Sequence, residues 1–174
     1  ESGSGKSTIA RMVVGLMQPD AGGVTIDGHN LNTSQDSASL RVVRQTLQMV
    51  FQSPYSSLNP RWRVNDILLE PIRAFDLISD EADQNRRVRE LLDQVGLSAS
   101  DAAKYPHEFS GGQRQRISIA RGLASNPSFM VCDEPTSALD VSVQAQVLNL
   151  LKELQRELGL TYLFISHDMA VVRV

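Results

Sequence analysis

Residues 1–8 read Glu-Ser-Gly-Ser-Gly-Lys-Ser-Thr, and residues 9–14 continue as an apolar helical face. The octapeptide fits the phosphate-loop pattern G-x-x-x-x-G-K-[ST] except for its first glycine, which would stand just before Glu1. In such a loop successive backbone N–H groups point at phosphate oxygens, and the following helix adds the positive end of its dipole. A Gly/Ser-rich linker is the alternative, but a linker does not run straight into a helical face. The stretch therefore predicts a phosphate-binding loop that opens a helix.

The residue types of this loop suit nucleotide chemistry. Gly3 and Gly5 allow the backbone to wrap closely around a phosphate. Lys6, one of three lysines in the chain, supplies a point charge for the β- and γ-phosphates. Ser7 offers a hydroxyl to Mg²⁺, and Thr8 lies near the α-phosphate. The predicted ATP-binding residues of the loop are Ser2, Gly3, Ser4, Gly5, Lys6, Ser7 and Thr8.

Composition and charge narrow the class of protein. The chain has 174 residues, which fits one compact domain with a hydrophobic core. Its net charge of −3 provides no basic field, so no nucleic-acid partner is expected. No apolar run reaches the roughly 18 residues that cross a bilayer. Any function at a membrane is therefore expected to need a partner protein. The single cysteine, Cys132, excludes an internal disulfide and lies in an apolar run that predicts a buried core residue.

Alternating strand and helix patterns predict an α/β fold in which helices cover a parallel sheet. Asp140 is a candidate N-cap for the helix of the last third, and Gly159 is its candidate stop. Many arginines fall in the middle third, where we expect a solvated face. The predicted elements are a helix at 6–17, a short strand with its turn at 24–28, strands at 47–51, 129–132 and 161–165, a loop at 53–60, and helices at 81–95 and from 141 to 158.

Two acidic residues, Asp133 and Glu134, follow the apolar run 129–132 at once. Ligands of open α/β sheets bind at the carboxyl ends of the strands, so both side chains are expected at the binding crevice. Asp133 is placed to hold Mg²⁺, and Glu134 to polarise an attacking water. An acidic pair after a strand is weak evidence alone, and the phosphate loop is what strengthens it.

Residues 109–113 read Phe-Ser-Gly-Gly-Gln and resemble the signature sequence of ABC ATPases, with Phe109 in place of the usual leucine. Physically this is a second anion site, because a hydroxyl and bare backbone stand at the start of a helix that runs to about Ala124. The predicted ATP-binding residues of this motif are Ser110, Gly111, Gly112 and Gln113.

The resemblance extends along the chain. Gln52 matches the family's Q-loop glutamine, residues 137–140 match its D-loop, and His167 matches its switch histidine. The resemblance implies a P-loop NTPase (RecA-like) core, residues 1–52 and 128–174, with an inserted helical subdomain, residues 53–127. Because the chain starts inside one motif and stops at Val174 soon after another, we expect a single domain truncated at both ends.

The same resemblance implies a mechanism. Two such domains close head to tail over two ATP molecules, and each site joins one subunit's phosphate loop to the other's signature. Glu134 orients water, Gln52 senses Mg²⁺ and that water, and His167 hydrogen-bonds the γ-phosphate. A chain on its own is therefore expected to hydrolyse ATP poorly. Transmembrane permease subunits are the further partners, and the expected location is the cytoplasmic face of the plasma (inner) membrane, as a peripheral subunit.

A finer resemblance, to the di- and oligopeptide importer branch, rests on residues 52–61 and 105–116. Relatives in that branch also handle nickel or glutathione, and a separate extracytoplasmic solute-binding protein selects the cargo. Arg61, Trp62 and Arg63 follow the Q-loop and are candidates for the permease contact. A tryptophan packed in the subdomain core beside solvated arginines is the alternative.

Two other functions remain open from the sequence. A non-transport ABC ATPase of the repair, chromosome-structure or translation kind is one, although no coiled coil or zinc module separates Gln52 from Ser110. A degenerate domain that binds ATP without hydrolysing it is the other, and the presence of Lys6, Glu134 and His167 argues against it. His29 and His107 are expected to play no part in the chemistry, and the histidines and cysteine show no metal-site spacing.

Overall fold

The computed structural model describes residues 4–26, 28–31 and 37–168. The helices are α1 (Lys6–Val13), α2 (Ser37–Thr46), α3 (Pro54–Ser57), α4 (Val64–Ala74), α5 (Glu81–Gln94), α6 (Gly111–Leu123) and α7 (Val141–Leu158), with short 3-10 turns at Ala99–Ala103 and Pro106–Glu108. The strands are β1 (Thr25–Ile26), β2 (His29–Asn30), β3 (Leu47–Val50), β4 (Phe129–Asp133) and β5 (Thr161–Ile165).

A parallel three-stranded sheet with the order β3-β4-β5 forms the centre of the molecule. Val50 pairs with Cys132 and Asp133 pairs with Ile165, so the carboxyl ends of the three strands lie level at one edge. Strands β1 and β2 form a separate antiparallel pair. The predicted parallel sheet is confirmed.

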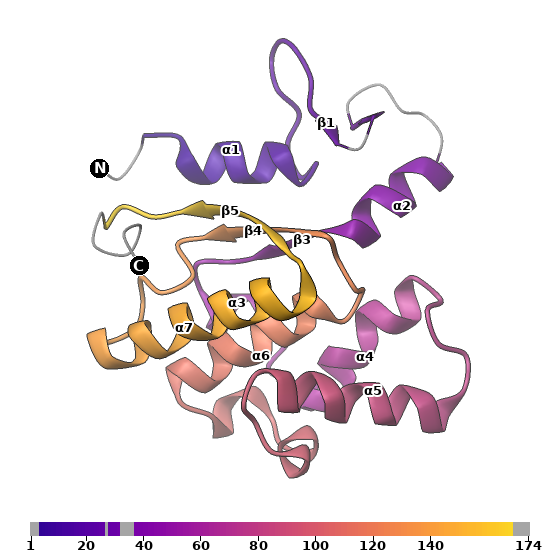
Figure 1. The fold of residues 1–174 in the computed structure, drawn as a ribbon, viewed down its shortest axis with the longest axis vertical. Coiled ribbons are helices and arrows are strands. Elements are labelled where there is room, and N and C mark those ends of the chain that lie inside the picture. The colour runs from indigo at the N-terminus through magenta and orange to yellow at the C-terminus, as the bar shows by residue number, and fades with distance from the viewer. Residues whose placement is uncertain (1–3, 27, 32–36, 169–174) are drawn as a thin grey trace.

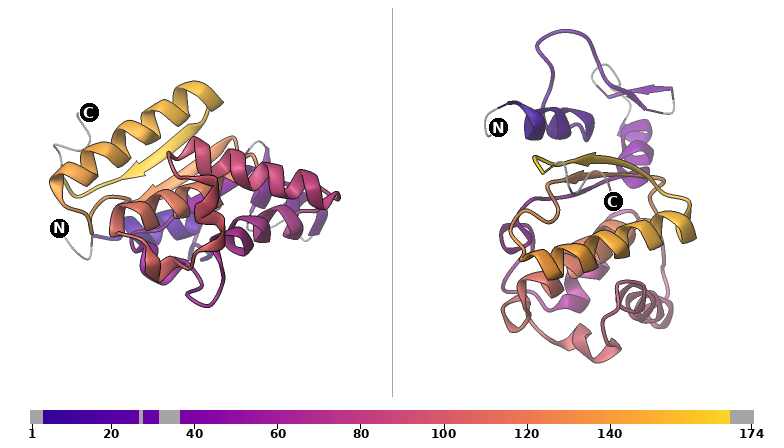
Figure 2. Two further views of the ribbon diagram at one scale, coloured as in Figure 1. Left: turned by 90° about the horizontal axis from the view of Figure 1, so that it is seen from below. Right: turned by 60° about the vertical axis from the view of Figure 1, so that its left-hand side comes forward.

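Both faces of the sheet are covered, and the alternation of side chains along each strand decides what covers them. Val50, Met130 and Cys132 face a large cluster with α4, α5, α6 and α7. Met49 and Val131, one position along, face a smaller cluster with Ala10 of α1 and Val43 of α2. Figures 1 and 2 show α1 on one side of the sheet and α6 with α7 on the other.

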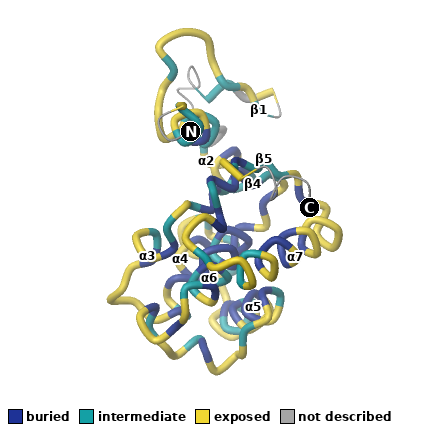
Figure 3. Tube along the Cα trace, turned by 90° about the vertical axis from the view of Figure 1, so that its left-hand side faces the viewer, coloured by how far each residue is buried: buried dark blue, intermediate teal, exposed yellow. Residues whose placement is uncertain are grey.

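The large cluster runs without a break from the strands into the helices of residues 53–127. Val64, Leu68, Ile72, Leu91 and Leu92 are among its fully buried members from α4 and α5. Figure 3 shows this continuous buried interior, in contrast with the exposed chain between α1 and β1. The subdomain boundaries at residues 52 and 128 stay a prediction, because one hydrophobic core spans both parts.

Three elements differ from the sequence-based expectation. The first helix ends at Val13 rather than at residue 17, because Gly15 adopts φ +72° and the N–H groups of Leu16 and Met17 turn back to the carbonyl of Arg11. The expected loop at 53–60 contains α3, with Pro54 at its first position. Helix α2 was not predicted.

Helices α5 and α7 begin at aspartate N-caps, and α7 ends at a glycine. Asp140 accepts a hydrogen bond from the N–H of Val143 at the start of α7, and Gly159 ends that helix at φ +66°, both as predicted. Asp80 accepts from the N–H of Asp83 at the start of α5 (3.0 Å).

Replacing Asp80 by alanine is expected to lower the free energy of unfolding by about 1 kcal/mol, because an N–H at the start of α5 loses its acceptor. Urea denaturation followed by circular dichroism measures the change. Asp80→Asn is the matched control, because asparagine caps about as well as aspartate. Equal stability of Asp80→Ala and the parent protein would contradict the capping role.

Candidate active site

The phosphate loop joins α1 through a left-handed glycine. Gly5 has φ +85°, and the N–H of Ile9 donates to its carbonyl (3.0 Å). Among the described residues, no heavy atom beyond its own chain neighbours lies within 4 Å of the position a side chain would take there, so the backbone conformation calls for glycine. The Lys6 ammonium donates to the hydroxyl of Ser4 (2.8 Å). Ser2 and Gly3 lie outside the described residues, and Thr8 is exposed.

Ser7 and Asp133 form the contact between the loop and the sheet. The Ser7 hydroxyl donates to Asp133 Oδ1 at 3.2 Å, where α1 packs against the end of β4. Asp133 is 4% exposed, so its carboxylate is held in place by the core. Hydroxyl and carboxylate oxygens suit Mg²⁺, which also keeps waters and phosphate oxygens in its shell. The described residues contain no cluster of three or more His, Cys, Asp or Glu that could hold a metal by themselves.

Glu134 is the meeting point of three strand ends. Gln52 follows β3 and donates through Nε2 to Glu134 Oε2 at 3.1 Å. His167 follows β5, and its Nδ1 lies 3.0 Å from the same oxygen. The Glu134 side chain is 14% exposed, whereas that of His167 is 54% exposed. The largely buried carboxylate of Glu134 thus contacts two residues that are far from it in the sequence.

The backbone of Glu134 is held in an uncommon conformation. Its φ is +47°, a left-handed value that costs a non-glycine residue roughly 1 kcal/mol or more. The Glu134 N–H donates to the carbonyl of Ile165 (2.9 Å), and the Glu134 carbonyl accepts a hydrogen bond from the Ser137 hydroxyl (3.1 Å). These bonds hold the Glu134 backbone in this conformation at the end of β4.

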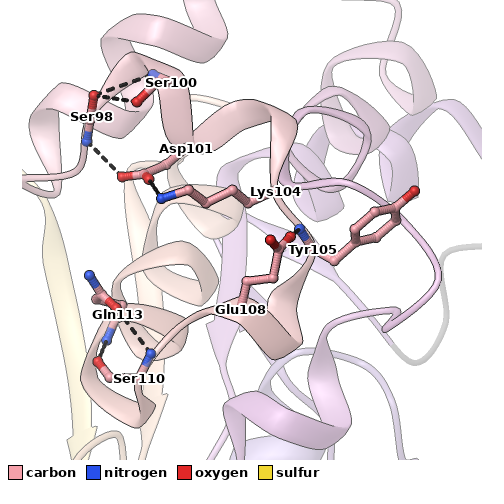
Figure 4. A network of polar contacts seen from close by, with 8 residues as sticks. All are labelled: Ser98, Ser100, Asp101, Lys104, Tyr105, Glu108, Ser110 and Gln113. Carbon is pink, nitrogen blue, oxygen red and sulfur yellow. Dashed lines mark hydrogen bonds and ion pairs between the residues drawn. The ribbon is translucent and has the colours of Figure 1, made fainter.

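The signature residues are organised by local hydrogen bonds. Ser110 is the N-cap of α6: its hydroxyl accepts from the N–H of Gln113 (3.3 Å), and Gln113 Oε1 accepts from the N–H of Ser110 (3.0 Å). The same step occurs twice upstream, where Asp101 accepts from the N–H of Ser98 and Glu108 from that of Tyr105. Figure 4 shows the three steps in succession. Residues 98–113, which lead into the signature and include it, are therefore held by their own local hydrogen bonds.

The structure brings some predicted site residues together and keeps others apart. Ser7, Asp133, Glu134, Gln52 and His167 gather at one edge of the sheet. The signature residues 110–113 belong to α6, which packs on the opposite face of the sheet from α1 (Figure 1). Within the described residues, one chain does not close its signature over its own phosphate loop.

The expectation of a solvated arginine face in the middle third is wrong for several members. Arg121 donates to the carbonyl of Ser57, and burial lowers the pKa of its guanidinium. Arg114 donates to the carbonyl of Phe109 (2.7 Å) and lies 5.8 Å from the centre of the Tyr55 ring. Arginines on α6 thus fasten the segment after Gln52 to the segment before Ser110. The seven-residue spacing of Arg114 and Arg121, which places both on one side of α6, is the feature of the sequence that could have indicated this role.

Cys132, Trp62 and His107 differ in burial. Cys132 is fully buried, as predicted. Trp62 is 43% exposed, so the alternative of a tryptophan packed in the core is wrong. His107 is exposed and stacks on Tyr105, with ring centres 5.6 Å apart. The side chain of His29 lies outside what the structure describes.

The chain is similar to known proteins of one family. The model of the family described as "ABC transporter" matches residues 1–137. The chain is 51% identical over 173 residues to the oligopeptide transport ATP-binding protein OppF of Bacillus subtilis, covering 99% of the chain and 57% of that protein. It is 50% identical over 173 residues to AmiF of Streptococcus pneumoniae, another oligopeptide transport ATP-binding protein, covering 99% of the chain and 56% of AmiF.

A solved structure repeats the fold. The dimeric, post-hydrolysis structure of the ATP-binding cassette MJ0796 bound to ADP and Pi superposes with a TM-score of 0.86 at 33% identity, covering 99% of this chain and 74% of that one. The fold and the sheet-edge site define a P-loop α/β protein of the ATP-binding-cassette class. The chain belongs to the ABC transporter family. It spans little more than half the length of these two curated relatives.

The Cys132 thiol provides a test of the core beneath Asp133. Burial raises its pKa to about 12, so the thiol stays protonated and unreactive at pH 8. Titration of the native protein with a chromogenic disulfide reagent is expected to show no reaction, and one thiol per chain after unfolding in urea. Ala82→Cys, on the exposed side of α5, is the positive control. Rapid reaction of native Cys132 would contradict the packing of β4.

Proposed function

We propose that this chain is the ATP-binding and ATP-hydrolysing part of an ABC importer for di- or oligopeptides or a related small solute. The observation that carries the proposal is the convergence of Gln52 and His167 on Glu134, beside the Ser7–Asp133 pair. A nucleotide held by the phosphate loop would present its γ-phosphate to this edge of the sheet. The names of the relatives, both oligopeptide transport ATP-binding proteins, support the peptide branch.

Each side chain has a role in the proposal. Ser4, Gly5, Lys6 and Thr8, with Ser2 and Gly3, bind the phosphates through backbone N–H groups and the Lys6 charge. Ser7, Asp133 and Gln52 hold Mg²⁺, which neutralises charge on the phosphates when bound. Glu134 accepts a hydrogen bond from the attacking water and aligns it with the γ-phosphate.

His167 and Gln52 act on the same carboxylate. Both contact Glu134 Oε2. Bound ATP gives His167 a phosphate oxygen as an alternative acceptor, which frees Glu134 for water. This exchange of partners links nucleotide arrival to activation of the carboxylate.

A second chain completes the site. Ser110, Gly111, Gly112 and Gln113 are the proposed binding surface for the nucleotide of a partner, because α6 lies on the other face of the sheet from α1. The helix start offers N–H groups and a positive dipole end to an anion. The dimeric state of MJ0796 supports this arrangement.

Transport requires membrane partners. Among the described residues no helix has both the length and the apolar character needed to span a bilayer. We propose permease subunits as partners, a peripheral position on the cytoplasmic face of the membrane, and cargo delivery by an extracytoplasmic solute-binding protein. Within the helical subdomain, residues 53–127, the exposed Trp62 with Arg61 and Arg63 forms the proposed permease contact. Co-purification with membrane subunits rather than ribosomes would separate this proposal from a non-transport role.

Two substitutions separate binding from hydrolysis. Lys6→Ala is expected to weaken ATP binding by roughly 10- to 100-fold, because a charge-assisted hydrogen bond of about 1.5–3 kcal/mol is lost. Glu134→Gln is expected to keep ATP affinity but lower turnover by on the order of 10²–10⁴-fold. Equilibrium binding of a fluorescent ATP analogue and phosphate release measure the two effects. Lys152→Ala, an exposed lysine on α7, is the control. Full turnover in Glu134→Gln would remove the role assigned to that carboxylate.

Mixing two inactive variants tests the shared site. Lys6→Ala damages the phosphate loop, and Ser110→Arg damages the signature. A mixed dimer would keep one intact site if loop and signature come from different chains, so ATPase activity is expected to reappear on mixing. The phosphate-release assay is run on each variant alone and on an equimolar mixture. No recovery in a mixture that forms dimers would indicate that each chain completes its own site.

A further inference from the structure

The start of α6, where the signature lies, packs against the first turn of α7. A methyl group built on Gly112 would lie less than 3.0 Å from Cγ1 of Val143, a separation that real side-chain carbons do not adopt. The other two atoms of that side chain, Cβ and Cγ2, would lie at 3.7 and 3.9 Å. The side chain of Val143 therefore fills the notch that the missing side chain of Gly112 leaves.

The neighbouring glycine is in a different situation. A methyl group on Gly111 would meet Cδ2 of Leu139 at 3.5 Å, which is ordinary van der Waals contact. Both contacts join the start of α6 to the segment that follows Glu134, through Leu139 before α7 and Val143 in its first turn. Only the contact at Gly112 excludes a side chain.

Val143 has little freedom to move aside. A β-branched residue in a helix is confined to essentially one χ1 rotamer, so the backbone position fixes where its methyl groups lie. That backbone is fixed, because the Val143 N–H donates to Asp140 Oδ1 at 3.0 Å and α7 is anchored by the buried Val147, Leu150 and Leu151. Val143 also packs against the large core cluster.

The start of α6 is equally fixed. Gly112 is buried and lies between Ser110 and Gln113, which are joined by the two hydrogen bonds of the capping box. Ser137, which donates to the carbonyl of Glu134, and Asp140, which caps α7 at Val143, lie in the short segment between Glu134 and α7. The signature therefore packs against the helix that directly follows this segment.

We infer that Val143 is a positioning residue that seats the signature on α7, and that Gly112 is glycine to admit its side chain. Through this contact the signature and the 137–140 segment of one chain approach a partner's nucleotide as one body. The inference rests on the proposed function for its consequence in catalysis. The packing itself does not depend on that function.

A rescue experiment in the protein as its gene encodes it tests the inference. Gly112→Ala is expected to lower kcat by about 100-fold, because a shift of about 1 Å at the signature misplaces the groups around the γ-phosphate. Affinity for a fluorescent ATP analogue at the phosphate loop is expected to stay unchanged, which general loss of folding would not allow. The urea midpoint is expected to fall.

The double variant decides the cause. Gly112→Ala with Val143→Ala is expected to raise both the urea midpoint and kcat to the levels of Val143→Ala alone, since the added methyl group then has room. Gly112→Ala with Val141→Ala is the matched control, because Val141 is 83% exposed and its removal opens no space at Gly112. Gly111→Ala is compared for stability only and is expected to keep the parent urea midpoint.

Three results would overturn the inference. The first is a double variant whose kcat and urea midpoint remain as low as those of Gly112→Ala. The second is equal rescue by Val141→Ala. The third applies if Gly112→Ala alone does not fold, and is a double variant that does not fold either. If the parent protein shows no ATPase activity, the proposed function fails, while the urea midpoints of the five variants still test the packing.

Discussion

The pairing of β4 between β3 and β5 is the constraint on which the rest of the structure depends. A parallel strand with neighbours on both edges and both faces covered has to be apolar along its length, and residues 129–132 meet that demand. The register places the three carboxyl ends side by side, so whatever follows each strand meets its counterparts. The polar site forms where the apolar core ends.

Covering both faces separates the two anion-binding elements. Helix α1 and the phosphate loop lie on one face, and α6 with the signature lies on the other (Figure 1). The same layering that completes the core leaves each half of the proposed ATP site unfinished within one chain. The proposed association with a second chain follows from this arrangement of the sheet and its helices.

Rigidity is concentrated around the proposed chemistry. Glu134 has a left-handed backbone held by the neighbouring strand, and Ser110 is locked in a capping box. Strain of roughly 1–3 kcal/mol at such a residue persists only where surrounding contacts overdetermine it. Arg121 and Arg114 add ties between α6 and the chain after Gln52, at the cost of burying part of their charge.

Much of this protein could be read from its sequence, because the signals are local. The phosphate loop, the apolar strand before Asp133, the caps at Asp140 and Gly159 and the signature at 110–113 each depend on neighbouring residues alone. The resemblance then supplied Gln52 and His167 as site residues. Only the tertiary structure decided that both meet Glu134 at one oxygen, that Arg121 of α6 is partly buried against Ser57, and that Val143 fills the place of a side chain at Gly112. Those contacts join residues separated by tens of positions, and their geometry follows from how the helices pack on the sheet, which no local pattern records.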